Sequence, residues 1–306
     1  MTFDYLPAEA AFLDPCRPGA ARPEEARAVV VPFGLEASVT FQGGTALGPA
    51  AILAASHEVE LFDEEFWREM VHDYEVASLV PLKPADDLKT SLTQIEGVVD
   101  ALLEGGRFPL VLGGEHSLTA GAIRPFAARY ADLVVLQFDA HADLRDGYEG
   151  EHFSHAAAMR RVLDHEHVSL VGVGIRNISL EEVPFYEANK TCQGQEGRVQ
   201  LHWAHQRRAW SIDEIVAPLK DRPIYVTFDV DCFDSSLMPA TGTPEPGGLE
   251  WDLALAVLRA ASEQGTIVGA DIVELAPRPG LHACDFLAAK LAYKLLSYAL
   301  GQNKSD

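Results

Sequence analysis

Short apolar runs alternate along this chain with longer stretches in which apolar residues recur at helical spacing. The runs typical of buried strands cover residues 28–33, 108–112, 133–138, 168–173, 224–228 and 266–273. The spacing predicts helices over residues 49–56, 95–103, 117–130, 155–165, 251–263 and 284–300, and Ser211 with Glu214 forms a capping-box pattern before another. Short strands that alternate with helices predict an α/β protein with a mostly parallel sheet covered on both faces.

The segments outside this alternation are less regular. Residues 1–26 are rich in Pro, Ala and Glu and predict an irregular arm that packs on the surface or on a neighbouring subunit, and residues 57–92 show little periodicity. A phosphate cradle is one interpretation of the glycine-rich loop at 42–49. A tight turn is favoured, because Gly-Lys-Ser/Thr is absent and Pro49 lacks an amide donor. No linker-like segment splits the chain, so we expect one domain over residues 1–306.

The formal net charge of −22 narrows the classes of partner. It argues against nucleic acid and anionic membranes, which attract basic patches. It suits a cationic small molecule, although an acidic surface that only keeps the protein in solution is the commoner cause of such a charge.

Cysteine usage and the N-terminus indicate a cytoplasmic protein. The cysteines are Cys16, Cys192, Cys232 and Cys284. They form no Cys-x-x-Cys motif, so we interpret them as reduced thiols, buried or at a boundary, with a disulfide as the alternative. Residues 1–15 lack the features of a signal peptide. No apolar run approaches the ~18 residues that span a bilayer, so no membrane partner is expected.

Three polar motifs follow predicted strands directly. They read GGEHS at residues 113–117, FDAHAD at 138–143 and FDVDCFD at 228–234. Side chains alternate along a strand, so Asp139, His141 and Asp143 tend to project from the same side. Ligand sites in such sheets lie beyond the carboxyl ends of the strands, so we expect the three motifs to meet there.

Together the motifs supply two imidazoles and four carboxylates. The candidate metal ligands are His116, Asp139, His141, Asp143, Asp229 and Asp231. So many oxygen ligands disfavour a structural zinc site and favour manganese or a similar hard ion. Six ligands suit a pair of ions roughly 3.5–4 Å apart. A single Asp at a strand end is usually a turn former, but the joint pattern is unlike that of ordinary turns.

Nearby polar residues are interpreted differently. Asp234 lies further along its motif and is expected to orient the ligands rather than to bind metal. His202 and His205 lie in a polar segment without acidic partners, so we expect them on the surface.

The three motifs resemble the metal-binding motifs of the ureohydrolase family, which comprises arginases, agmatinases and relatives. TGTPEPGG at residues 241–248 and DIVE at 271–274 extend the resemblance, which covers roughly residues 28–300. It implies an arginase-like three-layer α/β/α fold and two Mn²⁺ ions per subunit. It also implies hydrolysis of a guanidinium to urea and an amine, and assembly as a homo-trimer or homo-hexamer.

The resemblance also implies roles for the ligands. One ion would be bound by His116 and Asp143, the other by His141 and Asp231, and both by the bridging Asp139 and Asp229.

Three further residues match catalytic or substrate-binding positions. Glu274 matches the glutamate that binds the guanidinium, and a carboxylate can accept that fork in two parallel bonds. Thr243 matches a threonine of a substrate-side loop. His155 matches an active-site histidine proposed as proton shuttle or substrate contact, and His152 is the less favoured alternative. Asp143 would accept the proton of the attacking hydroxide as the tetrahedral intermediate forms.

The loop at 144–154 bears on the substrate. Its acidic residues Asp146, Glu149 and Glu151 would suit a distal ammonium and repel a carboxylate. This favours agmatine, a cationic guanidino compound, as in the bacterial and archaeal agmatinases that the loop resembles. Putrescine and urea would be the products. Ser235 and Ala156 depart from the family pattern without removing a ligand.

Other functions stay open. Aminopropylagmatine fits the same reasoning about charge, whereas guanidinobutyrate and arginine fit it less well. An inactive family member that acts as an assembly partner is another alternative. A metal-dependent deacetylase on a similar fold would call for neither Glu274 nor two metals.

Overall fold

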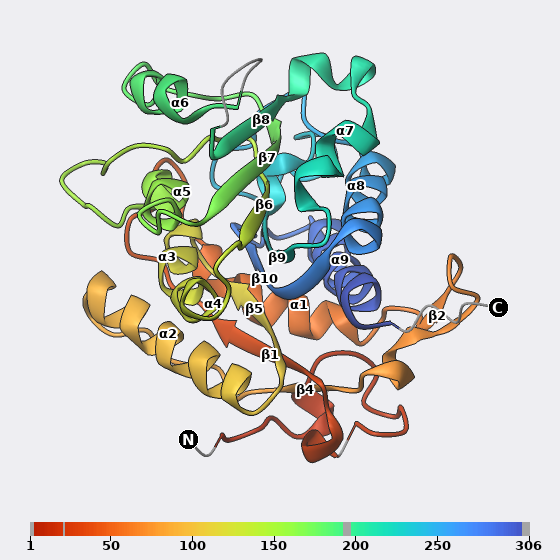
Figure 1. Ribbon diagram of the computed structural model, residues 1–306. Helices are drawn as coiled ribbons and strands as arrows, with labels where there is room; N and C mark the ends of the chain where they lie inside the picture. Colours follow the sequence, from red (N-terminus) through yellow and green to blue (C-terminus); the bar gives the residue numbers. More distant parts are fainter. Residues whose placement is uncertain (1–2, 21, 192–196, 302–306) are drawn as a thin grey trace.

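The computed structural model describes residues 3–20, 22–191 and 197–301. Within them, eight parallel strands form one sheet in the order β4-β1-β5-β10-β9-β6-β7-β8 (Figure 1). Their bounds are β1 Ala28–Phe33, β4 Val76–Ser78, β5 Phe108–Gly113, β6 Val134–Phe138, β7 Ser169–Ile175, β8 Val199–Trp203, β9 Pro223–Asp229 and β10 Thr266–Val273. The predicted α/β class with a parallel sheet is confirmed.

Helices cover both faces of the sheet (Figure 1). One face packs against α1 (Gly48–Ser56), α7 (Ile212–Val216), α8 (Trp251–Gln264) and α9 (His282–Leu300). The other packs against α2 (Leu88–Glu104), α3 (Thr119–Ala122), α4 (Arg124–Arg129) and α5 (Ala158–Val162). Alternate residues of β1 enter opposite layers, since Val30 joins the first core and Val29 and Val31 the second. The sheet is therefore buried on both sides.

Two predicted helices are interrupted. The one expected over 117–130 consists of a 3₁₀ turn (His116–Leu118) followed by α3 and α4. Pro125 lies in the first turn of α4, where its missing N–H is tolerated but would break a continuous helix. The one expected over 155–165 is a 3₁₀ turn (His155–Ala157) followed by α5. Each interrupted helix begins with a 3₁₀ turn that carries a candidate site residue, His116 in one and His155 in the other.

The two edge strands were not predicted. β4 is short, and β8 alternates apolar with polar residues because one side faces outward. His202 lies in β8 and is half-buried, and burial lowers its pKa to about 4. The expected surface position is therefore wrong for His202, whereas His205 is exposed.

The N-terminal arm packs on its own chain. Phe12 and Leu13 are buried in the core that contains α9, and the Leu6 N–H donates to the Ser78 carbonyl of β4. Cys16 in this arm is exposed, contrary to the prediction, whereas Cys232 and Cys284 are buried free thiols. Cys192 lies outside the described residues.

The glycine-rich loop is a turn that the chain itself fills. Glu36 Oε2 accepts hydrogen bonds from the Gly44 and Ala46 N–H groups and from the Thr45 hydroxyl, at 2.8–3.0 Å. Its carboxylate occupies the donors that a phosphate would need. This arrangement supports the turn rather than the cradle.

The sheet order places the polar motifs side by side. β5, β10, β9 and β6 are consecutive in the sheet and parallel, so their carboxyl ends meet at one edge. The described residues include no helix that is both long and apolar enough to cross a membrane.

Candidate metal centre

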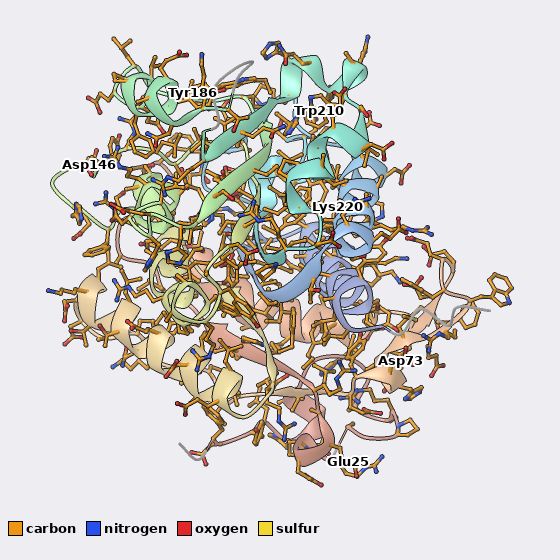
Figure 2. The ribbon with its side chains drawn as sticks, viewed as in Figure 1. Glu25, Asp73, Asp146, Tyr186, Trp210 and Lys220 are labelled. Atoms are coloured by element: carbon orange, nitrogen blue, oxygen red, sulfur yellow. The ribbon has the colours of Figure 1, made fainter. Side chains whose placement is uncertain are left out.

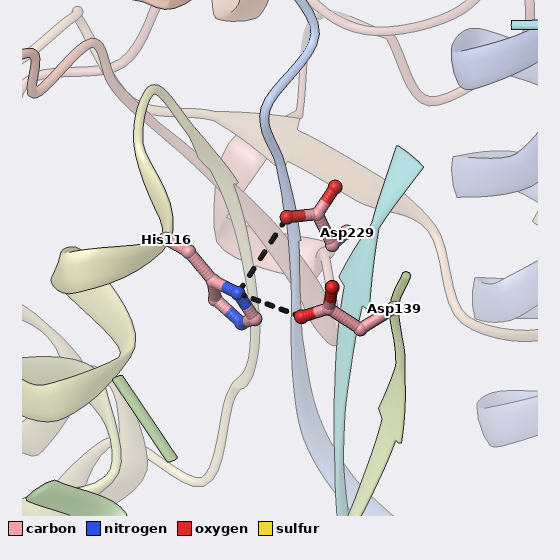
Figure 3. Close-up of side chains that lie close together, drawn as sticks. All are labelled: His116, Asp139 and Asp229. Carbon is pink, nitrogen blue, oxygen red and sulfur yellow. Dashed lines mark ion pairs between the residues drawn. The ribbon is translucent and has the colours of Figure 1, made fainter. Parts of the chain in front are cut away.

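The six predicted ligands converge beyond the ends of three strands. His116 follows β5, and Asp139, His141 and Asp143 follow β6. Asp229 ends β9, and Asp231 lies in the 3₁₀ turn directly after it. His116 Nδ1 lies 3.2 Å from Asp139 Oδ2, 3.0 Å from Asp143 Oδ2 and 3.6 Å from Asp229 Oδ2. Figure 3 shows the Asp139 and Asp229 carboxylates facing the imidazole.

A second group shares one carboxylate with the first. His141 Nδ1 lies 3.6 Å from Asp139 Oδ1 and 3.0 Å from Asp231 Oδ2. The ligand atoms of His116, Asp139 and Asp229 lie within 4.8 Å of one another, and so do those of Asp139, His141 and Asp231. The two oxygens of Asp139 thus face different imidazoles, which is the arrangement that a carboxylate bridging two ions requires.

The cluster fits a pair of cations. His116 Nδ1 is buried and has no hydrogen-bond partner among the described residues, although three carboxylates lie near it. Buried polar atoms are normally satisfied, and an imidazole nitrogen beside carboxylate oxygens is a common donor set for divalent ions. Four carboxylates also balance the charge of two dications.

Charge crowding perturbs the pKa of most groups that would bind a cation here. Burial lowers the pKa of His116 and of His141, but the facing carboxylates outweigh it and raise both pKa values well above the ordinary range. Burial, aided by Asp139, raises the pKa of Asp143 to about 7. Burial and Asp231 likewise raise the pKa of Asp229. Buried carboxylates that resist ionisation in this way would be stabilised by a dication.

Backbone geometry aims two of the side chains. Asp143 and Glu274 adopt positive φ angles of 52° and 67°. The left-handed region is costly for residues other than glycine and is concentrated at functional sites. Glu274 follows β10, and its Oε1 accepts a 2.6 Å hydrogen bond from the His116 N–H. This bond ties the end of β10 to the end of β5.

A pocket of about 150 Å³ opens over the cluster. His155, Thr243 and Glu274 line it together with Asp143 and other predicted ligands. Burial, aided by Glu115, raises the pKa of Glu274 to about 8. The predicted catalytic and substrate-side residues thus face one cavity, and their roles stay predictions. His152 does not line the pocket and instead contacts Arg161 and the Asp146 carbonyl.

His155 is positioned by two residues to which the sequence analysis gave no role. Ser38 Oγ donates to Glu115 Oε1 at 2.8 Å and lies 3.2 Å from His155 Nδ1. The hydroxyl proton is committed to Glu115, so Ser38 can only accept from the imidazole, which leaves His155 Nε2 unprotonated. Burial lowers the pKa of His155 and favours the neutral ring. Glu115 lies inside the GGEHS motif, whereas nothing in the sequence around Ser38 marked it.

The acidic loop is arranged differently from the prediction. Asp146 lies on the outer part of the loop (Figure 2), and its Oδ1 accepts from Arg161 at 2.6 Å. Asp146, Glu149 and Glu151 do not line the pocket over the cluster. Glu149 and Glu151 line a neighbouring pocket of about 440 Å³, which shares Val39 and Tyr148 with the first. Only a substrate that extends past Tyr148 would meet their carboxylates.

Another acidic residue lines the first pocket in their place. Glu182 is buried, and its oxygens accept from the Leu144 and Ser179 N–H groups at 2.8 and 2.6 Å. The contacts among the described residues pair no cationic side chain with it. The sequence analysis missed Glu182 because it lies far from the motifs.

Asp234 does not orient the ligands as expected. Its carboxylate accepts from Ser236 and from the Gly247 and Gly248 N–H groups, which lowers its pKa to about 2. It therefore closes the loop that carries Thr243.

Comparison with known proteins identifies the family. The sequence model described as Arginase family matches residues 26–297. The N(1)-aminopropylagmatine ureohydrolase of Synechocystis sp. is 35% identical over 283 residues, covering 90% of this chain and 89% of that protein. The agmatinase of Bacillus anthracis is 34% identical over 262 residues, covering 83% and 85%.

Solved structures agree with the sequence matches. The agmatine ureohydrolase of Thermoplasma volcanium has a TM-score of 0.79 at 29% identity, covering 90% of each chain. The arginase-like fold and the resemblance carried by the three motifs are thereby confirmed. This chain is a hydrolase that belongs to the arginase family.

Proposed function

We propose that this protein hydrolyses the guanidinium group of agmatine to putrescine and urea, with two Mn²⁺ ions per subunit. The observation that carries the proposal is the convergence of two imidazoles and four carboxylates on a pocket that is also lined by a buried glutamate, Glu274. Two bound dications would supply a water activated near neutral pH and would balance the charge of the carboxylates. His116 and Asp143 would hold one, His141 and Asp231 the other, with Asp139 and Asp229 shared.

Glu274 is proposed to bind the guanidinium. Its carboxyl is buried and raised in pKa, so an arriving cation would stabilise its ionised form. The His116 N–H already fixes one oxygen, which restricts the rotation of the side chain. A fixed carboxylate holds a planar guanidinium in one orientation, which is the positioning that the reaction needs.

Two residues are proposed to move protons. Asp143 lines the pocket over the cluster, so its carboxylate can accept the proton of the attacking hydroxide and release it later. His155, held as the neutral ring with an unprotonated Nε2 that lies 3.4 Å from Thr40 Oγ1, can relay a proton to the departing amine.

The charge of the pocket supports a cationic substrate. Glu182 would face a distal ammonium from a buried position. Arg145 also lines the pocket, but its guanidinium is paired with Glu181 at 2.9 Å, so it offers little to a substrate carboxylate. Agmatine therefore fits better than arginine or guanidinobutyrate.

Aminopropylagmatine is the second candidate, and the neighbouring acidic pocket favours it. Its extra aminopropyl group would extend past Tyr148 toward Glu149 and Glu151. Relatives that act on agmatine and on aminopropylagmatine, by their names, match this chain about equally well. The chain length of the substrate is therefore the point to test.

The test is urea release from agmatine, aminopropylagmatine, arginine and guanidinobutyrate by protein reconstituted with Mn²⁺. We expect agmatine to have the highest kcat/KM. Glu274→Gln should lower that value roughly 30- to 1,000-fold, the usual effect of removing one partner of a buried charge pair. No urea from any of the four compounds would refute the proposal, and arginine as the best substrate would refute the argument from charge.

Paired variants separate the two candidates. Glu149→Gln with Glu151→Gln should raise KM for aminopropylagmatine and leave KM for agmatine unchanged. Asp146→Asn is the matched control, because Asp146 is engaged with Arg161 away from both pockets. A higher kcat/KM for aminopropylagmatine than for agmatine, lost in the double variant, would make the longer amine the substrate.

We also propose, from the resemblance to the family, that the protein is cytoplasmic and assembles as a homo-trimer or homo-hexamer. Sedimentation velocity would test the assembly.

A further inference from the structure

A buried hydrogen-bonded chain continues from the far ring nitrogen of His116. His116 Nε2 lies 2.8 Å from Thr227 Oγ1, and Thr227 Oγ1 donates to Asp271 Oδ1 at 2.7 Å. All three residues are fully buried. Neither Thr227 nor Asp271 lines the pocket over the cluster. Neither has a role in the function proposed above.

The sheet register builds this chain. Thr227 on β9 and Asp271 on β10 are directly paired across parallel strands, so their side chains lie on the same face. Asp271 Oδ2 accepts two further hydroxyl protons, from Tyr225 at 2.7 Å and from Thr119 at 2.9 Å. Burial raises the pKa of Asp271, and His116 and the three hydroxyl donors oppose that rise. Among the described residues no ion pair reaches this buried carboxylate, and three hydroxyls satisfy it instead.

The proton positions follow from this count. A threonine hydroxyl has one proton, and Thr227 gives it to Asp271. Thr227 can therefore only accept from His116, so in the neutral ring, which is the form that binds a metal ion, the imidazole proton must be on Nε2. The lone pair is then on Nδ1, the nitrogen that faces Asp139, Asp143 and Asp229 and has no hydrogen-bond partner among the described residues.

We propose that Thr227 and Asp271 are positioning residues that lock His116 in the tautomer able to bind the first ion. The proposal rests on the proposed two-metal site. Partners of this kind on the second nitrogen of a metal-binding histidine typically change metal affinity by 10- to 100-fold. Here a hydroxyl stands between the imidazole and the carboxylate, so the carboxylate acts through Thr227.

The direct test is Mn²⁺ binding to metal-free protein, measured by isothermal titration calorimetry without substrate. Thr227→Val removes the hydroxyl but keeps the shape, and should weaken one of the two binding events by at least about tenfold. Thr227→Ser keeps the hydroxyl and should stay within about threefold of the wild type. Tyr225→Phe is the matched control. This variant removes a hydroxyl donor from the same Asp271 carboxylate without changing a contact of His116, so its Mn²⁺ affinity should also stay within about threefold of the wild type.

Asp271→Asn tests whether Asp271 sets the position of the His116 proton or only holds Thr227 in place. The amide oxygen should occupy the Oδ2 position, which has two hydroxyl donors, so the NH₂ group would face Thr227. Thr227 would then accept from the amide and donate to His116 Nε2, which moves the imidazole proton to Nδ1. Asp271→Asn should therefore weaken Mn²⁺ binding more than Thr227→Val does. The double variant should bind better than Asp271→Asn alone, because the reversed hydrogen bond is no longer transmitted.

Several outcomes would overturn the inference. Thr227→Val with wild-type affinity would do so, as would a loss in Tyr225→Phe equal to that in Thr227→Val. If Thr227→Val does not fold, the inference stands or falls on Asp271→Asn and Thr227→Ser, with melting temperatures as the check on folding. A wild-type protein that releases no urea but shows the expected affinity losses would refute the proposed function and leave this inference intact.

Discussion

Replacing Ser38 by alanine removes one oxygen that joins three parts of the candidate site. Ser38 Oγ donates to Glu115 at 2.8 Å, accepts from the His155 backbone N–H at 3.0 Å and lies 3.2 Å from His155 Nδ1. The variant leaves a buried carboxylate with one donor fewer and an imidazole without its orienting acceptor. We expect the variant to lose both stability and catalytic rate.

The magnitudes follow from these contacts. A hydrogen bond to a charged group contributes about 1.5–3 kcal/mol and a neutral one about 1 kcal/mol, so Ser38→Ala should lower the free energy of unfolding by roughly 2–4 kcal/mol. Glu115 keeps its bonds from the Ala37 and Ser38 N–H groups and from Ser117, which limits the loss. A catalytic group released from its orientation typically costs roughly 10- to 100-fold in rate, so kcat should fall by that factor.

The assay is urea release from agmatine at saturating Mn²⁺, with kcat and KM determined separately. KM should change little, because Glu274 rather than His155 is proposed to hold the guanidinium. Ser154→Ala is the matched control. Ser154 Oγ lies 3.4 Å from the same nitrogen but makes no hydrogen bond to Glu115 in the described part of the chain, so this variant should retain most of its kcat. Wild-type kcat in a folded Ser38→Ala protein would refute the proposed role of His155 and its support.

The remaining predictions concern stability. The Lys294 ammonium is fully buried and bonds to Asp63 at 2.9 Å and to Glu65 at 2.8 Å, where it occupies an acidic cluster that could otherwise attract a metal. Lys294→Met should therefore lower the free energy of unfolding, measured in urea, by about 3–5 kcal/mol. Adding Asp63→Asn to this variant should recover part of the lost stability. An unchanged urea midpoint in Lys294→Met would refute the prediction. Metal-free protein should melt at lower temperature as the pH rises from about 5 to 8. In the folded protein the carboxyls of Asp143 and Glu274 have raised pKa values of about 7 and about 8, so they keep protons that the unfolded chain has already released. The melting temperature should therefore fall by about 5 °C or more over this pH range. Adding Mn²⁺ at pH 8 should restore most of the lost melting temperature. Melting of the EDTA-treated protein that is independent of pH would contradict those shifts.

Much of the fold was predictable because parallel strands that are buried on both faces consist of continuous runs of apolar residues. The strands next to the site, β5, β6, β9 and β10, were found nearly to the residue for that reason. β4 was missed because it has only three residues, although all three are buried, and β8 was missed because it alternates apolar with polar residues. The interruption before Pro125 was missed because the apolar spacing continues across the break.

The candidate site was predictable only where its chemistry is concentrated in short motifs. His116, Asp139 and Asp231 could be grouped from the sequence because carboxylates and imidazoles that gather directly after buried strands usually bind a cation. Ser38 and Glu182 could not be found in this way. Each depends on a contact between residues 38 or more positions apart, which periodicity does not register. The prediction that the acidic loop faces the substrate failed for a similar reason. Asp146 pairs with Arg161, which lies 15 positions away and could not be paired with it from the sequence.

The order of strands in the sheet has a consequence for how the protein is made. The two strands at the centre, β9 and β10, are the last to leave the ribosome, and they fill the space between β5 and β6. A nascent chain that has reached residue 222 therefore exposes two apolar edges at once, a state that invites aggregation until the gap is closed. It also lacks Asp229, Asp231 and Glu274. If the chain binds Mn²⁺ as proposed, the complete cluster can form only after Asp231 has been translated, and chains arrested before residue 223 should retain no Mn²⁺ on gel filtration.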